Sequence, residues 1–268
     1  MNEPLSSPAD EAARSIQQYR ELLSHLLECA QGLLPTVKFD KERSQHVAAM
    51  CLYATILQSI GECYRLLDRP TVTVPGIMRS VLESYADLSA VIENPDYPKK
   101  MLATLYEEQR KHLQDAINEP QNPFHAAFTM KIDPRNELPK VTSELNHLRQ
   151  QGHFPLRIKD RLAAAGLADI YKTVYWELCL HGHNNLAILE LRHIRKTGSG
   201  NGDFEIDVFA DNTTPQLGTT YHTLSGMLAD SSRRLYRLLD FTPPGEFNHL
   251  VEEFERFRAR ATEILSAP

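Results

Sequence analysis

The chain has 268 residues, 24% of them charged and 42% hydrophobic, and a formal net charge of −6 at pH 7. Ordinary glycine and proline contents exclude collagen-like and low-complexity classes, and the mild acidity argues against bulk nucleic-acid binding. No apolar run approaches the roughly 20 residues that span a bilayer, and the polar N-terminus shows no secretory signal. We therefore predict a cytoplasmic protein without a membrane segment.

The first two thirds of the chain predict a succession of helices. Apolar side chains recur at near-helical spacing over residues 8–34, which predicts a helix. We predict an N-terminal helical segment, 1–39, followed by a single helical-bundle domain, 40–268. Residues 40–67 give the clearest helical pattern, with Asp40 as the predicted N-cap. The further helices expected are 75–92, 99–118, 137–150, 156–166 and 168–183, with a proline-containing loop at 119–135.

The periodicity then changes from that of a helix to that of a strand. Apolar residues alternate with polar ones over 189–194 and again over 204–208, on either side of a glycine-rich turn. Two helices, about 215–240 and 245–265, close the chain. The predicted fold class is therefore all-α, a multi-helix bundle with a β-hairpin insertion at about 187–210.

Arg79 and Glu83 form the first candidate polar site, because residues four apart on a helix share a face and can pair. They lie off the apolar face of the 75–92 helix, beside the small residues Ala86 and Ala90. A solvated ion pair, contributing only ~0.3–0.5 kcal/mol, is one interpretation. The other is that a second helix packs on the alanines and buries the pair. A basic group at 157–161 is interpreted as a solvated helix face.

The 168–183 helix carries the second candidate site. It is apolar nearly all round, which predicts a central, buried helix. Glu177 and His181 are four residues apart and are expected to hydrogen-bond; the carboxylate would raise the pKa of the imidazole, whereas burial would lower it. His181 and His183 are expected at the C-terminal end, where the helix dipole favours a protonated histidine.

No metal or cofactor is predicted. The Glu177–His181 spacing differs from the Glu-x-x-His of di-iron bundles. Zinc-protease, P-loop, dinucleotide-binding and nucleophile-elbow motifs do not occur.

The spaced motifs resemble those of an uncharacterised, mainly helical family, the domain of unknown function numbered 5677. Its members show an Arg-x-x-x-Glu helix after a long apolar helix, matched by Arg79 and Glu83. A second helix follows, with the pattern Tyr-x-x-x-Tyr-x-x-x-Ser/Cys and a His at its end. Tyr171, Tyr175 and Cys179 match the pattern, and His181 matches the closing His. The resemblance covers roughly residues 45–240. It implies a shared helical fold and polar site, but no established reaction.

Three functions stay open, and whether the chain is an enzyme is not decided. The favoured hypothesis is a binding or scaffold module in which Arg79, Glu83 and His181 form a polar network. The second is a metal-independent ribonuclease or defence or toxin effector with a distant likeness to HEPN domains. There His181 would be the general acid or base, Arg79 would contact phosphate, and Glu83 would orient Arg79.

The third hypothesis is a small anionic ligand bound between helices. Arg79 would clamp the anion, and aromatic side chains would line the pocket. The binding residues predicted from these patterns are Tyr171, Tyr175, Glu177 and His183, with Tyr85 and Trp176 in the same lining. The partners left open are RNA, a small anionic ligand and a second copy of the chain in a homodimer.

Overall fold

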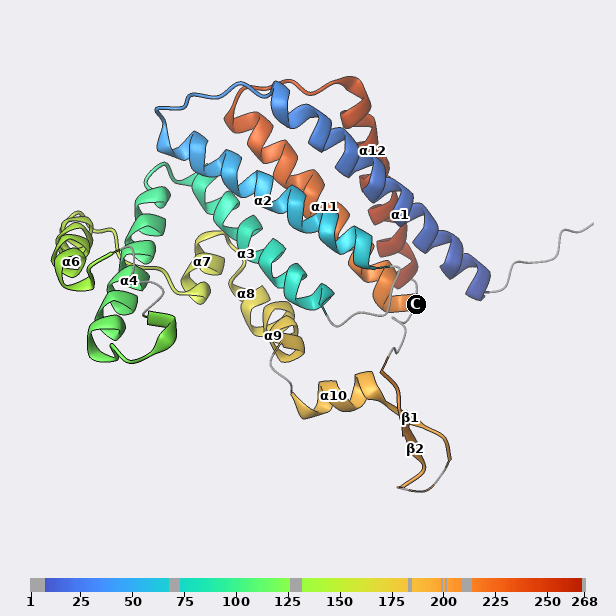
Figure 1. Ribbon diagram of the computed structural model, residues 1–268. Helices are drawn as coiled ribbons and strands as arrows, with labels where there is room; N and C mark the ends of the chain where they lie inside the picture. Colours follow the sequence, from blue (N-terminus) through green and yellow to red (C-terminus); the bar gives the residue numbers. More distant parts are fainter. Residues whose placement is uncertain are drawn as a thin grey trace, which may run out of the picture.

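Helices dominate the molecule, and the strands form one small antiparallel sheet (Figure 1). The computed structural model describes residues 8–67, 73–125, 132–182, 185–198, 200, 202–208 and 214–266. The predicted fold class, all-α with a β-hairpin, is confirmed within these residues.

Five long helices form the main bundle. They are α1 (Pro8–Leu33), α2 (Ser44–Leu66), α3 (Val74–Glu93), α11 (Thr214–Leu238) and α12 (Gly245–Ser266). A short 3₁₀ turn, η1 (Leu34–Thr36), follows α1. Helix α2 packs on α3, α1 packs on α11 and α12, and α11 also contacts α2 and α3. Leu23 and Leu26 of α1 lie fully buried in the same core as Ile56 and Ile60 of α2.

Helix α2 begins later than the sequence predicts, and one of its faces lies in the core of the bundle. It starts at Ser44, and Asp40 instead accepts a hydrogen bond from the Glu42 backbone N–H (2.9 Å) in the preceding turn. By length and a mean hydropathy of 1.2, Ser44–Leu66 is a helix that could cross a membrane. In this fold its apolar face packs into the core through residues such as Tyr53.

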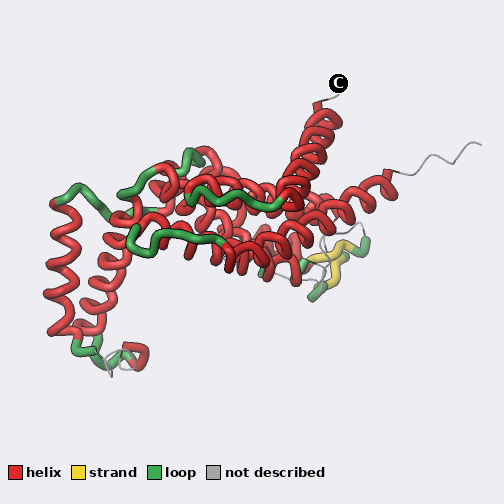
Figure 2. Tube along the Cα trace, turned by 90° about the horizontal axis from the view of Figure 1, so that it is seen from above, coloured by secondary structure: helices red, strands yellow, loops and turns green. Residues whose placement is uncertain are grey.

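A helical hairpin extends from one end of the bundle. It consists of α4 (Tyr97–Asn118) and α6 (Pro134–Gln150), and Figures 1 and 2 show the pair projecting sideways. Ala103, Leu145 and Leu148 form its small core. The predicted loop at 119–135 joins the two helices, with 126–131 outside the described residues.

Short helices cover α3. They are α7 (Ile158–Ala164), α8 (Ala168–Ile170), the π-helix η2 (Tyr171–Tyr175) and α9 (Trp176–Gly182). They bury a second apolar cluster consisting of Leu82, Ala86, Leu162, Tyr175 and Leu178. The prediction of a central helix buried all round is wrong, because α9 covers the flank of α3 and leaves Trp176 58% exposed.

The β-hairpin is shorter than predicted. Residues 189–193, expected in a strand, belong to helix α10 (Leu186–His193), which the Asn185 side chain caps by accepting from the Ala187 N–H (3.1 Å). The strands are β1 (Ile194–Lys196) and β2 (Phe204–Ile206). Asp203 approaches the end of β1 closely, since a Cβ on Gly198 would lie 2.5 Å from the Asp203 side chain.

Candidate functional site

A stripe of charged residues runs along α3 on the side that the short helices cover. Arg79, Glu83 and Asp87 succeed one another at intervals of four residues. The Arg79 Nε donates to Glu83 Oε1 over 3.1 Å, and this bond raises the pKa of the guanidinium. The Arg79 side chain is 37% exposed and that of Glu83 is 22% exposed, so the pair is partly covered, neither fully solvated nor buried. Helices α7 and α9 pack on α3 and partly cover this charged stripe.

Arg161 of α7 joins the two carboxylates of this stripe. Its Nη1 donates to Glu83 Oε2 over 3.2 Å, its Nε donates to Asp87 Oδ1 over 2.9 Å, and its Nη2 donates to Asp87 Oδ2. Burial alone would lower the pKa of Arg161, but the hydrogen bonds and charge of Asp87 outweigh it and raise that pKa. The bidentate contact therefore holds a permanent cation between two carboxylates. The prediction that 157–161 forms a solvated basic face is wrong for Arg161.

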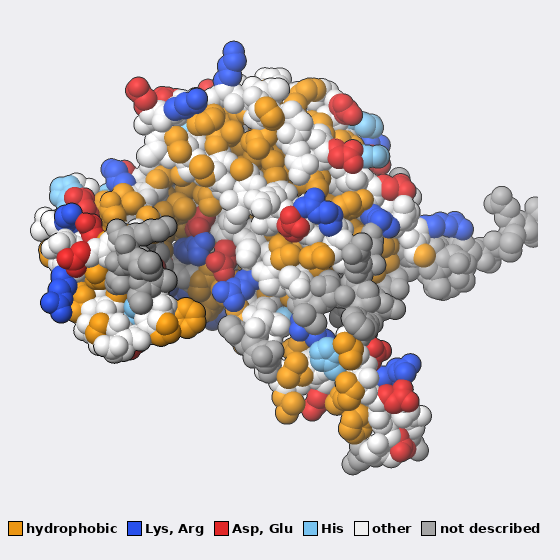
Figure 3. Space-filling model, in the orientation of Figure 1, with side chains coloured by type: hydrophobic (Ala, Val, Ile, Leu, Met, Phe, Trp, Pro, Cys, Tyr) orange, Lys and Arg blue, Asp and Glu red, His pale blue; other side chains and the backbone are white. Residues whose placement is uncertain are grey.

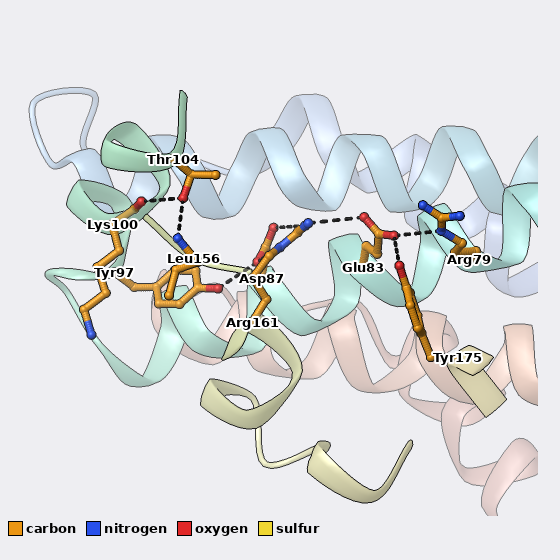
Figure 4. Close-up of polar contacts among 9 residues, drawn as sticks. All are labelled: Arg79, Glu83, Asp87, Tyr97, Lys100, Thr104, Leu156, Arg161 and Tyr175. Carbon is orange, nitrogen blue, oxygen red and sulfur yellow. Dashed lines mark hydrogen bonds and ion pairs between the residues drawn. The ribbon is translucent and has the colours of Figure 1, made fainter. Parts of the chain in front are cut away.

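Tyr97 closes the network at one end. Its hydroxyl donates to Asp87 Oδ1 over 2.8 Å, and its pKa is raised by burial and by the charge of Asp87. Thr104 of the same helix accepts from the Leu156 N–H over 2.8 Å, which fixes the segment leading into α7 (Figure 4). Helix α4 thus helps to position Arg161.

Tyr175 closes the network at the other end. Its hydroxyl donates to Glu83 Oε1 over 3.0 Å, and burial followed by the neighbouring Glu83 raises its pKa. The Arg79 Cζ lies 5.5 Å from the centroid of the Tyr175 ring, within range of a cation–π contact. Tyr171 stacks on the same ring with centroids 5.7 Å apart. Both tyrosines lie in the π-helix η2, a rare element that occurs frequently at functional sites.

His181 contacts Arg192 and not the charged stripe on α3. Its Nδ1 accepts from Arg192 Nη2 over 2.9 Å, and its backbone carbonyl accepts from the same nitrogen over 3.3 Å. No hydrogen bond or ion pair joins His181 to Arg79 or Glu83 in the described part of the chain. Burial first, and then Arg192, lower the pKa of His181, with Glu177 opposing them. The expected protonated histidine at the helix end is therefore not favoured.

The remaining predicted site residues divide as follows. Glu177 is exposed and influences His181 only through its charge, and His183 lies outside the described residues. Tyr85 donates to Asp230 of α11 over 2.7 Å, so it faces away from the α7–α9 side. An open hollow of about 340 Å³ between α2 and α3 is lined by none of the predicted residues.

Sequence reasoning missed Asp87, Arg161 and Tyr97. The signal for Asp87 was present, since it continues the four-residue spacing of Arg79 and Glu83. Arg161 and Tyr97 carried no local signal, because their partners are brought to them by the tertiary packing of α7 and α4 on α3. Among the described residues, no group of three or more His, Cys, Asp or Glu side chains is arranged to hold a metal ion.

Comparison with protein-family models gives one match, over residues 46–201, to a family of unknown function, DUF5677. This span covers more than half of the chain. The chain belongs to the DUF5677 family. No curated protein and no solved structure matches it. The DUF5677 region runs from α2 to the hairpin turn and contains the whole network from Tyr97 to Tyr175. It is shorter than the expected 45–240, because the closing helices lie outside it.

Proposed function

We propose that this chain is a non-catalytic binding module that holds an anionic group of its ligand at Arg79. The observation that supports this most directly is the state of the Arg79 guanidinium. Figure 4 shows its Nε bonded to Glu83, and its Cζ lies 5.5 Å from the centroid of the Tyr175 ring. Its two terminal nitrogens have no hydrogen-bond or ion-pair partner among the described residues. A guanidinium presents these nitrogens as a planar fork that suits a carboxylate or phosphate.

The rest of the network supports a positioning role. Arg161 neutralises the second oxygen of Glu83 and both oxygens of Asp87, so Glu83 is held in place without depending on Arg79 alone. Arg79 is therefore pre-oriented before any ligand arrives, which reduces the entropy lost on binding. The aromatic surface formed by Tyr171 and Tyr175 lies next to this cation.

A fluorescence titration tests the proposal. Trp176 is the chain's one tryptophan, follows Tyr175 directly, and is exposed on α9, so its emission reports on this surface. The probes are inorganic phosphate, citrate and a short single-stranded RNA. We expect at least one to change the emission saturably, and we expect Arg79→Gln to weaken that binding at least tenfold.

Arg149→Gln is the matched control. Arg149 is 39% exposed and pairs with Glu107 on the α4–α6 hairpin, so its loss removes the same charge elsewhere. Binding by none of the three probes, or equal weakening by both substitutions, would overturn the proposal. Circular dichroism of each variant verifies that the fold is intact.

The ribonuclease alternative is less well supported. It requires His181 and Arg79 to act on one phosphate, whereas His181 is bonded to Arg192. The same RNA, incubated with the protein and a chelator and then analysed on a gel, separates the two functions. Binding with intact RNA agrees with the module, and cleavage that disappears in His181→Ala supports the nuclease.

A further inference from the structure

Helix α12 is attached to the bundle through the first half of its length, where it packs on α1 and α11. The buried side chains among its described residues are Phe247, Leu250, Val251 and Phe254. An ion pair of 2.6 Å between Arg233 of α11 and Glu255 adds a polar contact. Figure 2 shows the rest of the helix leaving the bundle toward the C-terminus. A short row of mainly apolar contacts therefore holds α12 on the α1–α11 pair.

His222 of α11 lies beneath this row of contacts. Its ring centroid is 5.4 Å from that of Phe254 on α12 and 5.4 Å from that of Tyr19 on α1. The imidazole therefore lies where the three helices meet. A Cβ on Gly226, one turn further along α11, would lie 3.2 Å from Phe254 Cζ. The glycine thus lets α12 approach α11 closely beside His222.

The His222 imidazole has no polar partner for its inner nitrogen. The Nε2 atom is buried and makes no hydrogen bond within the described chain. A protonated imidazole carries an N–H donor on each ring nitrogen, and the donor on Nε2 would have no acceptor here. A buried charge without a partner is strongly unfavourable. The position beneath α12 therefore suits the neutral form of His222 and disfavours the protonated form.

The titratable groups around His222 do not offset this effect. Burial lowers the pKa of His222 most, and the charge of Arg258 on α12 lowers it further. No carboxylate among the described residues raises that pKa. Tyr19, on the α1 side, stays neutral because burial raises its own pKa. Protonation of His222 therefore places a cation near Arg258 with no anion to balance it.

We propose that α12 is an acid-releasable strap, which stays on α1 and α11 while His222 is neutral and detaches when His222 is protonated. Once α12 has detached, the pKa of His222 returns toward the ordinary 6.5, above its value beneath the strap. Attachment is therefore strongest above about pH 6.5, weakens as the pH falls below it, and stops weakening below the lowered pKa. Release would uncover the apolar side chains of α1 and α11 that α12 covers.

Hydrogen–deuterium exchange of the full chain at pH 7.5 and 5.0, corrected for the intrinsic effect of pH on exchange, tests this proposal independently of the Arg79 site. We expect the protection of amides 247–257 to fall at least fivefold at pH 5.0, while amides 53–60 of α2 keep theirs. His222→Phe keeps an aromatic ring beneath α12 but cannot titrate, so its protection should not fall. His249→Gln is the matched control, because His249 is an exposed histidine on the same helix, and this variant should behave as the wild type does.

Equal protection of 247–257 at both pH values overturns the proposal, as does a fall that persists in His222→Phe. Loss of protection throughout the chain at pH 5.0 also contradicts it, because that is global unfolding. Arg258→Gln gives a second test that spares the core, since the Arg258 side chain is 58% exposed. Removing this cation should make the acid-induced loss smaller, and an unchanged loss would count against the proposal. Circular dichroism at pH 7.5 verifies that each variant is folded.

Discussion

The α7–α9 segment and residues 185–208, which contain α10, β1 and β2 and are called the arm, are neighbours in the chain. Both are built from short elements rich in apolar residues, but they are attached to the rest of the molecule very differently. The α7–α9 segment buries Leu162 and Leu178 against α3 and is fastened there by the ionic contacts of Arg161. The arm buries none of its apolar side chains (Figure 3), and Arg192 connects it to α9 by donating to His181. Apolar content alone therefore does not decide which segment joins a core; a partner surface of matching polarity does.

The largest expected effect in this comparison comes from removing Asp87. In Asp87→Ala, Arg161 and Tyr97 lose their shared acceptor in a buried setting, so the free energy of unfolding should fall by about 4 kcal/mol. Urea denaturation followed by circular dichroism measures it. Glu62→Ala removes an exposed pair with Arg65 and serves as the control. Equal urea midpoints for the two variants would show that the α3 network does not hold the fold.

Two leucine truncations sharpen the same comparison. Leu162 is fully buried in the α7–α9 cluster, so Leu162→Ala should lower the free energy of unfolding by about 3 kcal/mol. Leu191 is 68% exposed on α10, so Leu191→Ala should change the stability of the monomer by less than about 0.5 kcal/mol. Urea denaturation followed by circular dichroism measures both. A large loss in Leu191→Ala would mean that the arm is packed on the bundle in solution.

The smallest effect concerns the contact between the arm and α9. Neutral His181 accepts from Arg192 at Nδ1, and burial and Arg192 lower its pKa below the ordinary 6.5. When the contact with Arg192 is broken, His181 therefore binds a proton at a higher pH than it does within the contact. The contact is fully present above about pH 6.5, weakens as the pH falls below it, and stops weakening below the lowered pKa.

Trp176 on the same helix reports this change. Its emission should shift as the pH falls from 7.5 to 5, and the shift should disappear in His181→Gln, which keeps an acceptor but does not titrate. His193→Gln should retain the shift, because His193 bonds instead to the Asp207 carbonyl within the arm. A shift that survives in His181→Gln would assign it to another group.

Several of these features could be predicted from the sequence, for identifiable reasons. The long helices follow from periodic apolar residues, and the Arg79–Glu83 pair follows from spacing within one helix. The grouping of Arg161 with Asp87 could not be predicted, because 74 residues separate them and only the packing of α7 on α3 joins them. Alternation of apolar and polar residues predicts a strand over 189–193, whereas this segment completes helix α10, whose N-cap is Asn185.

The π-helix η2 has a consequence for how this segment tolerates changes in length. A π-helical turn accommodates one residue more than an α-helical turn, so the chain after it is rotated relative to a continuous α-helix. Deleting one residue within 171–174 would restore the ordinary winding and change which side chains on each side of the turn face α3. The extra residue therefore sets the phase between Tyr171 and the helix that carries Trp176 and His181. In this segment, side-chain orientation depends on the count of residues as much as on their identity.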